Sequence, residues 1–174
     1  ADGQLFRMYC LKVVPKEFDG EGTAASPYLI RNKADLDKVF HAVDTELYDY
    51  TGTHFRVEGD IDFAGVQGFR GYSNTAPAYA FNGVLDGNGH TIRNLYINSA
   101  SYPVGLFGYV KTGASVTKLG ITGNVTTTNK SYGQAGGIAG YMERGPAVTK
   151  SWSSVNVTGS KHGGGIAGYT AGGS

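Results

Sequence analysis

Three aspartates and one histidine are spaced closely enough to suggest acid-base chemistry. Asp60 and Asp62 lie in "EGDIDF", and Asp86 and His90 lie in "DGNGH". Paired carboxylates can act as general acid and base on a glycosidic bond, and Asp86 with His90 could form a second catalytic pair. The alternative is that Asp60 and Asp86, each beside a glycine, are turn residues that bond their own backbone. We expect the structural role, and an enzyme that acts on polysaccharides through these four residues is the alternative.

The same oxygens could also bind calcium. Asp60, Asp62, Asp86 and Asn88 offer the hard ligands that calcium takes, but their spacing matches no known calcium loop. The sequence has no H-E-x-x-H or C-x-x-C for zinc, no G-x-S-x-G nucleophile elbow and no phosphate-binding loop. We therefore expect no cofactor and no metalloprotease, serine-hydrolase or nucleotide chemistry in this chain.

Three tyrosines recur at one position of a repeated motif. Tyr109, Tyr141 and Tyr169 each follow the second glycine of "GLFG", "GIAG" and "GIAG". Equivalent positions in stacked repeats predict a ladder of rings. A ladder that faces water could stack on the sugar rings of a ligand, whereas a ladder that only covers a corner of the fold would bind nothing. We expect the covering role, with ligand binding as the alternative.

Repeats in the second half of the chain indicate what positions these tyrosines. "VTKL" at Val116 is matched by "VTKS" at Val148, and "NVTT" by "NVTG". Each unit predicts three short strands, which become stable when each strand lies in register on its equivalent in the next unit. The sequence therefore predicts a parallel β-helix with Leu106, Ile138 and Ile166 in one inward ladder, and Val116 with Val148 in another. The motif glycines should let the chain bend or approach a neighbour: Gly105, Gly108, Gly137, Gly140, Gly165 and Gly168.

The first third of the chain differs from these repeats. Apolar residues at Leu36, Val39, Phe40 and Val43 form one stripe of an amphipathic helix over about residues 33–43, with Asn32 or Asp35 as its N-cap. We predict a capping region over residues 1–66 and β-helix coils over 67–174. The fold class is thus all-β, with one short helix as an N-terminal cap.

Composition excludes several classes of partner. The chain has 28 glycines in 174 residues, about twice the usual share, and few prolines, which favours an ordered, turn-rich β protein. A net charge of +1 gives no electrostatic case for nucleic acid or an anionic membrane. No apolar run has the length of a transmembrane segment.

These motifs together resemble the GLUG repeat family of bacterial surface proteins. The likeness includes the glycine motifs, the preceding "FNGVLDGNGHTIRNLYI" and the opening "FDGEGTAASPYLIRNKADLDKV". The resemblance implies a right-handed parallel β-helix in a secreted or surface-attached bacterial protein, often the stalk of an adhesin-like chain. Some bacterial immunoglobulin A peptidases also carry the motif outside their catalytic domain.

We therefore expect a non-catalytic, extracellular or cell-surface module that displays or contacts a ligand. The expected partner is a glycan or protein of a host or bacterial surface. A carbohydrate-binding module and a β-helical lyase or glycosidase are the alternatives. Because the chain ends at "GIAGYTAGGS", just after a new repeat begins, we also expect a longer parent chain or a partner that covers the last coil.

Overall fold

Parallel strands stacked in register build the frame of this molecule. The computed structural model describes residues 18–45, 49–64 and 80–172. Sheet A contains, in spatial order, β1 (Tyr28–Ile30), β2 (His54–Val57), β4 (Val84–Asp86), β7 (Ser115–Thr117) and β11 (Ala147–Thr149). Sheet B contains β3 (Ile61–Asp62), β5 (Thr91–Ser99), β8 (Gly120–Thr127) and β12 (Trp152–Thr158).

Two smaller sheets complete each later coil. Sheet C contains β6 (Phe107–Val110), β10 (Ala139–Met142) and β14 (Ala167–Thr170), and sheet D contains β9 (Gln134–Gly136) and β13 (His162–Gly164). Every strand pair is parallel. The predicted parallel β-helix is confirmed. The repeat unit has a fourth short strand, β9 or β13, that the sequence pattern did not reveal because its residues are mostly glycine and alanine.

The predicted inward ladders are confirmed by the register. Ala139 pairs with Phe107 and with Ala167, which places Ile138 level with Leu106 and Ile166. Leu106 and Ile138 are fully buried, and Ile166 packs against the same core. In sheet A, Val148 pairs with Val116, and that ladder continues through Leu85 and Phe55. Stacked aliphatic and aromatic side chains therefore form a continuous core along the solenoid.

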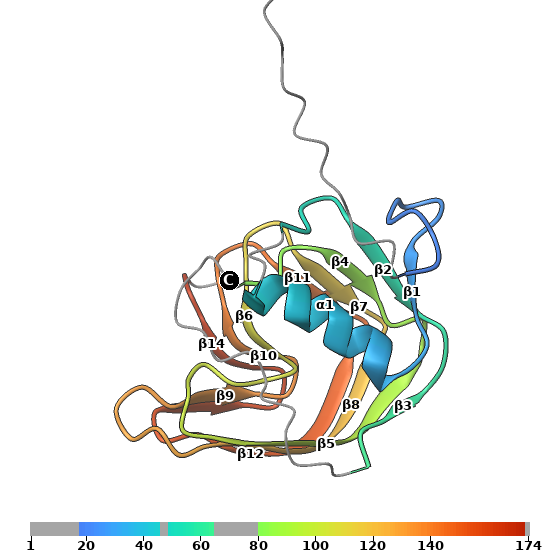
Figure 1. Cartoon of the computed structure of the whole chain (residues 1–174). Helices are drawn as coiled ribbons and strands as arrows, with labels where there is room; N and C mark the ends of the chain where they lie inside the picture. The colour runs from blue at the N-terminus through green and yellow to red at the C-terminus, as the bar shows by residue number, and fades with distance from the viewer. Residues whose placement is uncertain (1–17, 46–48, 65–79, 173–174) are drawn as a thin grey trace, which may run out of the picture.

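Helix α1 (Lys33–Thr45) covers one end of the stack, as predicted for the cap (Figure 1). Asn32 begins it, because its side-chain oxygen accepts a hydrogen bond from the Asp35 N–H at 3.0 Å. The Asp35 carboxylate in turn accepts a hydrogen bond from the Arg31 N–H at 3.1 Å. Leu36, Val39 and Phe40 of the apolar stripe are buried, and the Phe40 ring lies 5.4 Å from the Phe107 ring of β6. The helix therefore replaces a further coil as the cover of the core.

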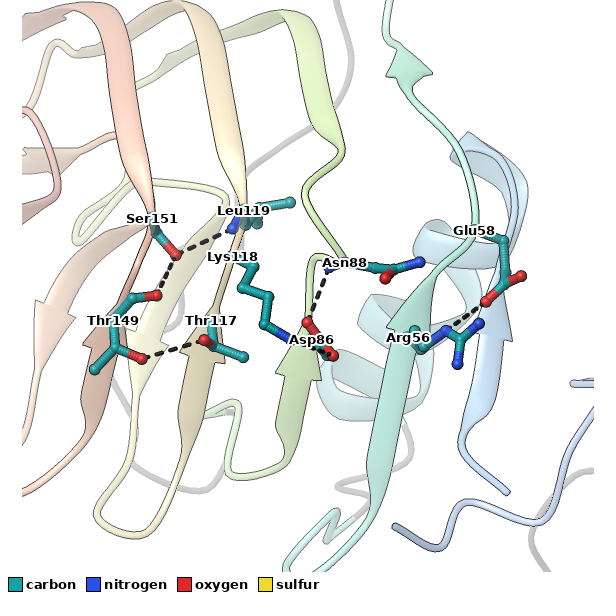
Figure 2. A network of polar contacts seen from close by, with 9 residues as sticks. All are labelled: Arg56, Glu58, Asp86, Asn88, Thr117, Lys118, Leu119, Thr149 and Ser151. Carbon is teal, nitrogen blue, oxygen red and sulfur yellow. Dashed lines mark hydrogen bonds and ion pairs between the residues drawn. The ribbon is translucent and has the colours of Figure 1, made fainter. Parts of the chain in front are cut away.

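Polar contacts join successive coils at the turn between sheets A and B (Figure 2). The Thr149 hydroxyl donates to the Thr117 hydroxyl at 3.2 Å, one coil away. The Leu119 N–H donates to the Ser151 hydroxyl at 3.1 Å, and that hydroxyl donates to the Thr149 carbonyl at 3.0 Å. Lys118 reaches back to Asp86 at 3.4 Å. Hydrogen bonds and an ion pair on the outer surface of this turn thus hold adjacent coils together, in addition to the apolar contacts of the core.

Some sequence predictions lie outside the described residues. These include a strand at Leu5–Val14, the single Cys10, a loop at 71–78 and the predicted boundary near residue 66. The side chain of Val43 is also outside them. Sheets A and B already begin at β1 and β3, within the predicted capping region. Within the described ranges no helix has the length and apolarity needed to cross a membrane.

Candidate functional site

Asp60 connects two coils on the outer surface of sheet B. It lies just before β3, and its carboxylate accepts a hydrogen bond from the Thr91 N–H of the next coil at 2.9 Å. Arg93 forms an ion pair with the same carboxylate, and His90 Nδ1 lies 3.4 Å from it. The Thr91 N–H and, after it, Arg93 and His90 hold the pKa of Asp60 below its ordinary value. Asp60 is therefore a stable carboxylate that joins coils, and not a turn residue bonded to its own backbone.

Asp62 and Asp86 adopt the turn role that the sequence suggested for such residues. The Asp62 carboxylate accepts hydrogen bonds from the Ala64 N–H at 2.7 Å and from the Asn94 amide at 2.9 Å. The Asn94 amide is the main cause that lowers the pKa of Asp62. The Asp86 carboxylate accepts from the Asn88 N–H at 2.9 Å. Both carboxylates thus stabilise local turns.

The structure does not bring His90 and Asp86 together, as the alternative catalytic pair would require. His90 lies beside Asp60, while the charged partner of Asp86 is Lys118. The "DGNGH" segment turns between β4 and β5, which separates the side chains at its two ends. The neighbour of His90 comes from the preceding coil and not from its own turn.

The surroundings of Asp60 and Asp62 favour their ionised forms. A general acid at neutral pH needs a raised carboxyl pKa, whereas the pKa values of Asp60 and Asp62 are lowered. Their oxygens already accept hydrogen bonds from the protein. In the part of the chain that the structure describes, no three His, Cys, Asp or Glu side chains are grouped to hold a metal ion.

The predicted tyrosine ladder is present on the outside of sheet C. Tyr141 pairs in register with Tyr109 and Tyr169. The ring centroids lie 4.5 Å and 5.2 Å apart, with interplanar angles of 17° and 27°. The rings are therefore stacked face to face along the solenoid axis. Because each inner face is covered by the next ring, a sugar could stack only at an end of the ladder.

A carboxylate that the sequence reading overlooked ends this ladder. The Tyr109 hydroxyl donates to Glu143 Oε1 at 3.1 Å, and both the N–H and the hydroxyl of Thr112 donate to Glu143 Oε2 at 2.9 Å. The Thr112 N–H is the main cause that lowers the pKa of Glu143. Burial, and after it the nearby Glu143 charge, raises the pKa of Tyr109. The ladder is thus anchored by structural hydrogen bonds.

A second pair of stacked rings comes from two loops. The Tyr102 and Tyr132 rings lie 5.1 Å apart, and Lys161 Nζ lies 5.4 Å from the centroid of the Tyr132 ring. Sequence reasoning missed this pair, although the dipeptide "SY" at 101–102 and again at 131–132 was a usable signal. His162, which follows Lys161, places its ring 5.2 Å from that of Tyr169.

Trp152 differs from all these aromatic residues. It begins β12 on the outer face of sheet B, and 49% of its surface is exposed. A Cβ atom added to Gly120 would lie 2.5 Å from the Trp152 indole, so the indole rests directly on that glycine. No described ring or cation lies on its other face. Trp152 thus offers an exposed aromatic surface that is separate from the tyrosine ladder.

The motif glycines mostly serve close approach, as predicted. Cβ atoms added to Gly105, Gly140 and Gly168 would lie 2.4–2.8 Å from backbone atoms of neighbouring strands. At Gly137 the added atom would meet Ser153 Oγ at 2.3 Å. Gly165 is an exception, since nothing lies within 4 Å of the added atom. Gly108 lies within β6.

Comparison with known proteins relates this chain to parts of much longer proteins. No protein-family model matches the chain. The chain is 36% identical over 124 residues to halomucin of Haloquadratum walsbyi, an alignment that covers 66% of this chain and 1% of halomucin. It is 35% identical over 115 residues to a "Putative Gly-rich membrane protein" of Evansella cellulosilytica, covering 62% of this chain and 12% of that protein. The chain therefore spans only a small part of these relatives.

A solved structure supports the architecture. It is described as "a putative immunoglobulin A1 protease from Bacteroides ovatus" and superposes with a TM-score of 0.51. The match covers 88% of this chain and 56% of that one, at 19% sequence identity. Likeness at this identity shows a shared β-solenoid fold and nothing about chemistry.

Proposed function

We propose that this chain is a non-catalytic β-helical module of a larger surface protein, where it provides reach and displays a ligand-contacting face. The observation that carries the proposal is the state of the candidate acid-base residues. Asp60, Asp62 and Asp86 all accept hydrogen bonds from backbone N–H groups, and Asp60 also joins one coil to the next. Carboxylates committed in this way support a scaffold better than a reaction.

The relatives support the surface setting. One of them is named halomucin and another is described as a membrane protein, and each is much longer than the region it shares with this chain. Membership of the GLUG repeat family, with a right-handed coil in an adhesin-like bacterial protein, belongs to the same proposal. The repeated glycines and the register of their ladders fit that assignment.

Labelling of intact cells tests the surface location. Antibodies raised against this chain should label unpermeabilised cells that express the full-length parent protein, and external protease should remove the signal. Labelling that appears only after permeabilisation, with none of the protein in the culture medium, would contradict the proposal.

A hydrolysis assay tests the absence of catalysis. The purified chain should release no reducing ends or unsaturated products from a panel of polysaccharides. Product formation that disappears in both Asp60→Asn and Asp62→Asn variants would establish the polysaccharide-active alternative instead.

A chelator test addresses the cofactor. Because the aspartate oxygens are satisfied by the protein, we propose that the chain folds without calcium. Its melting temperature should be the same in EDTA and in calcium chloride. A melting temperature that is much higher in calcium chloride than in EDTA, with the difference lost in Asp62→Asn, would contradict this part of the proposal.

A further inference from the structure

The outer face of sheet B is uncharged along strands β8 and β12. Alternate residues of β8 and β12 point inward and are apolar or small, such as Ile121 and Val125, which are fully buried. The other residues point outward and lie in register across the coils. We define the sheet B face by the outward residues on β12, β8 and the end of β5: Trp152, Ser154, Asn156, Thr158, Thr122, Asn124, Thr126, Tyr96 and Asn98. In Figure 1 these strands run along the lower side of the solenoid.

Trp152 provides a flat apolar surface on this face. Gly120 has no side chain, so the indole packs directly against that glycine while about half of the residue stays exposed. Exposure of half of a tryptophan costs free energy in an isolated fold, and such residues are frequent at binding sites. An open aromatic face binds the apolar CH face of a pyranose ring with little loss of side-chain entropy.

Amides and hydroxyls lie beside this surface. The Asn156 amide donates to the Asn124 oxygen at 3.0 Å, which orders the two side chains along the axis. This bond leaves an acceptor on Asn156 and donors on Asn124, and both side chains are exposed. Tyr96 pairs in register with Asn124, which extends the row. Neighbouring donors and acceptors match the hydroxyl groups of a sugar, which both donate and accept.

The lack of charge restricts the ligand further. Strands β8 and β12 contain no Asp, Glu, Lys or Arg, and the nearest charged side chain on the outer side of β5, Arg93, is already ion-paired with Asp60. A polyanion such as nucleic acid or a sulfated glycan would require cationic side chains on the face. A second copy of the chain would require a larger apolar area, and Trp152 is the only large exposed apolar residue on these strands.

We propose that the sheet B face binds a neutral glycan, with Trp152 stacked on one sugar ring and the Asn124–Asn156 row bonding the hydroxyls of another. Trp152 and Asn156 are four residues apart on one strand, which places them about 13 Å apart. That separation suits an oligosaccharide and not a single sugar. This inference rests on the proposed surface module and names the class of ligand that the module contacts.

Affinity electrophoresis tests the proposal. The chain is run in native gels cast with glucomannan, with galactomannan, with xyloglucan or with heparin, beside gels without polysaccharide. We expect retardation in at least one neutral polysaccharide and none in heparin. Trp152→Ala should weaken the binding by about tenfold or more, and Asn156→Ala by about threefold. Gly120→Ala should also weaken it, because the new methyl group displaces the indole.

Matched controls separate binding from folding. Tyr132→Ala removes another exposed ring, 54% accessible, from a different surface and should leave the affinity within about twofold. Circular dichroism and melting of each variant show whether it is folded, and Trp152→Phe should retain part of the affinity. Unchanged binding by a folded Trp152→Ala variant would overturn the proposal.

Three other outcomes would also overturn it: no retardation in any of these neutral polysaccharides, retardation in heparin alone, or a dimer in sedimentation velocity that Trp152→Ala dissociates. The last would identify the face as a self-association surface. None of these results changes the labelling of intact cells, so the surface module and its glycan ligand are tested separately.

Discussion

The two ends of the solenoid are filled in opposite ways. At the aromatic end, defined here as Phe40, Phe55, Phe81 and Phe107, large rings occupy a wide interior. Phe81 and Phe107 stack 4.3 Å apart, and Phe40 of α1 packs on Phe107. At the glycine corner, defined as residues 136–140 and the equivalent residues 164–168, backbones of neighbouring coils approach closely.

The same parallel stacking thus accommodates both large rings and close backbone contacts in the interior. The capped end stabilises itself by burying apolar area, so its energy depends on atoms that are present. The corner depends on the absence of side chains, because a Cβ atom added to Gly136, Gly140 or Gly168 would lie within 3 Å of a backbone atom. Removing atoms should therefore damage the first region, and adding atoms should damage the second.

The largest effect is expected at the aromatic end. Phe107→Ala removes the ring that joins α1 to the coils and should lower the free energy of unfolding by about 3–5 kcal/mol. Urea denaturation followed by circular dichroism measures this change. Tyr132→Ala, which removes an exposed ring, should change it by less than about 0.5 kcal/mol. Equal losses in the two variants would contradict the assignment of the core.

A smaller loss is expected when a methyl group is added to the corner. The Cβ of Gly140→Ala would lie 2.4 Å from the Val104 N atom, a rigid backbone group. We expect a loss of about 1–3 kcal/mol. Gly165→Ala provides the matched control from the same motif, because it has open space, and should be nearly neutral. If both substitutions were neutral, the corner would be looser than described.

A gain in stability is expected beside the corner. Ser153 Oγ is buried without a hydrogen-bond partner in the described part of the chain, at the inward position held by Ile121 one coil below. Ser153→Ala removes this unsatisfied group and should raise the free energy of unfolding by about 1 kcal/mol. Ser154→Ala, on the outer face, should have no measurable effect. A loss in Ser153→Ala would mean that the hydroxyl has a bound partner in solution.

The smallest expected effect is on the pH dependence of the free energy of unfolding, and it should be similar in both regions. Folding lowers the pKa of Asp60, near the aromatic end, and of Glu143, at the end of β10. Each contributes stability that is complete above the ordinary carboxyl pKa of about 4 and is lost as the pH falls through the lower native pKa. Asp60→Asn and Glu143→Gln should therefore each flatten the acid side of a stability-against-pH curve. A slope identical to that of the original chain would contradict the lowered pKa.

Local pattern was sufficient for much of the fold. The repeated "GIAG" and "VTK" segments predicted the stacked coils and the ladders through Ile138 and Val116, because equivalent residues in a solenoid occupy equivalent positions. The apolar stripe of α1 predicted the cap in the same way. The fourth short strand was not predictable, since glycine and alanine carry little strand signal.

The candidate site was less predictable. The partner of His90 is Asp60, thirty residues earlier, and the indole of Trp152 lies on Gly120 of the coil below. Such contacts depend on which residue of the next coil lies level with each side chain. The sequence of a single turn such as "DGNGH" does not say which residue of the adjacent coil will lie beside each of its side chains.

The sequence by itself determines that this protein is a capped parallel β-helix, because repeated short strands can bury their apolar faces only by stacking on one another. Only the tertiary structure decided which aromatic rings remain open. The tyrosines, being equivalent in every coil, stack face to face and cover one another. Trp152 rests on a glycine, which leaves its outer face to water, and that difference arises from the residue in the neighbouring coil.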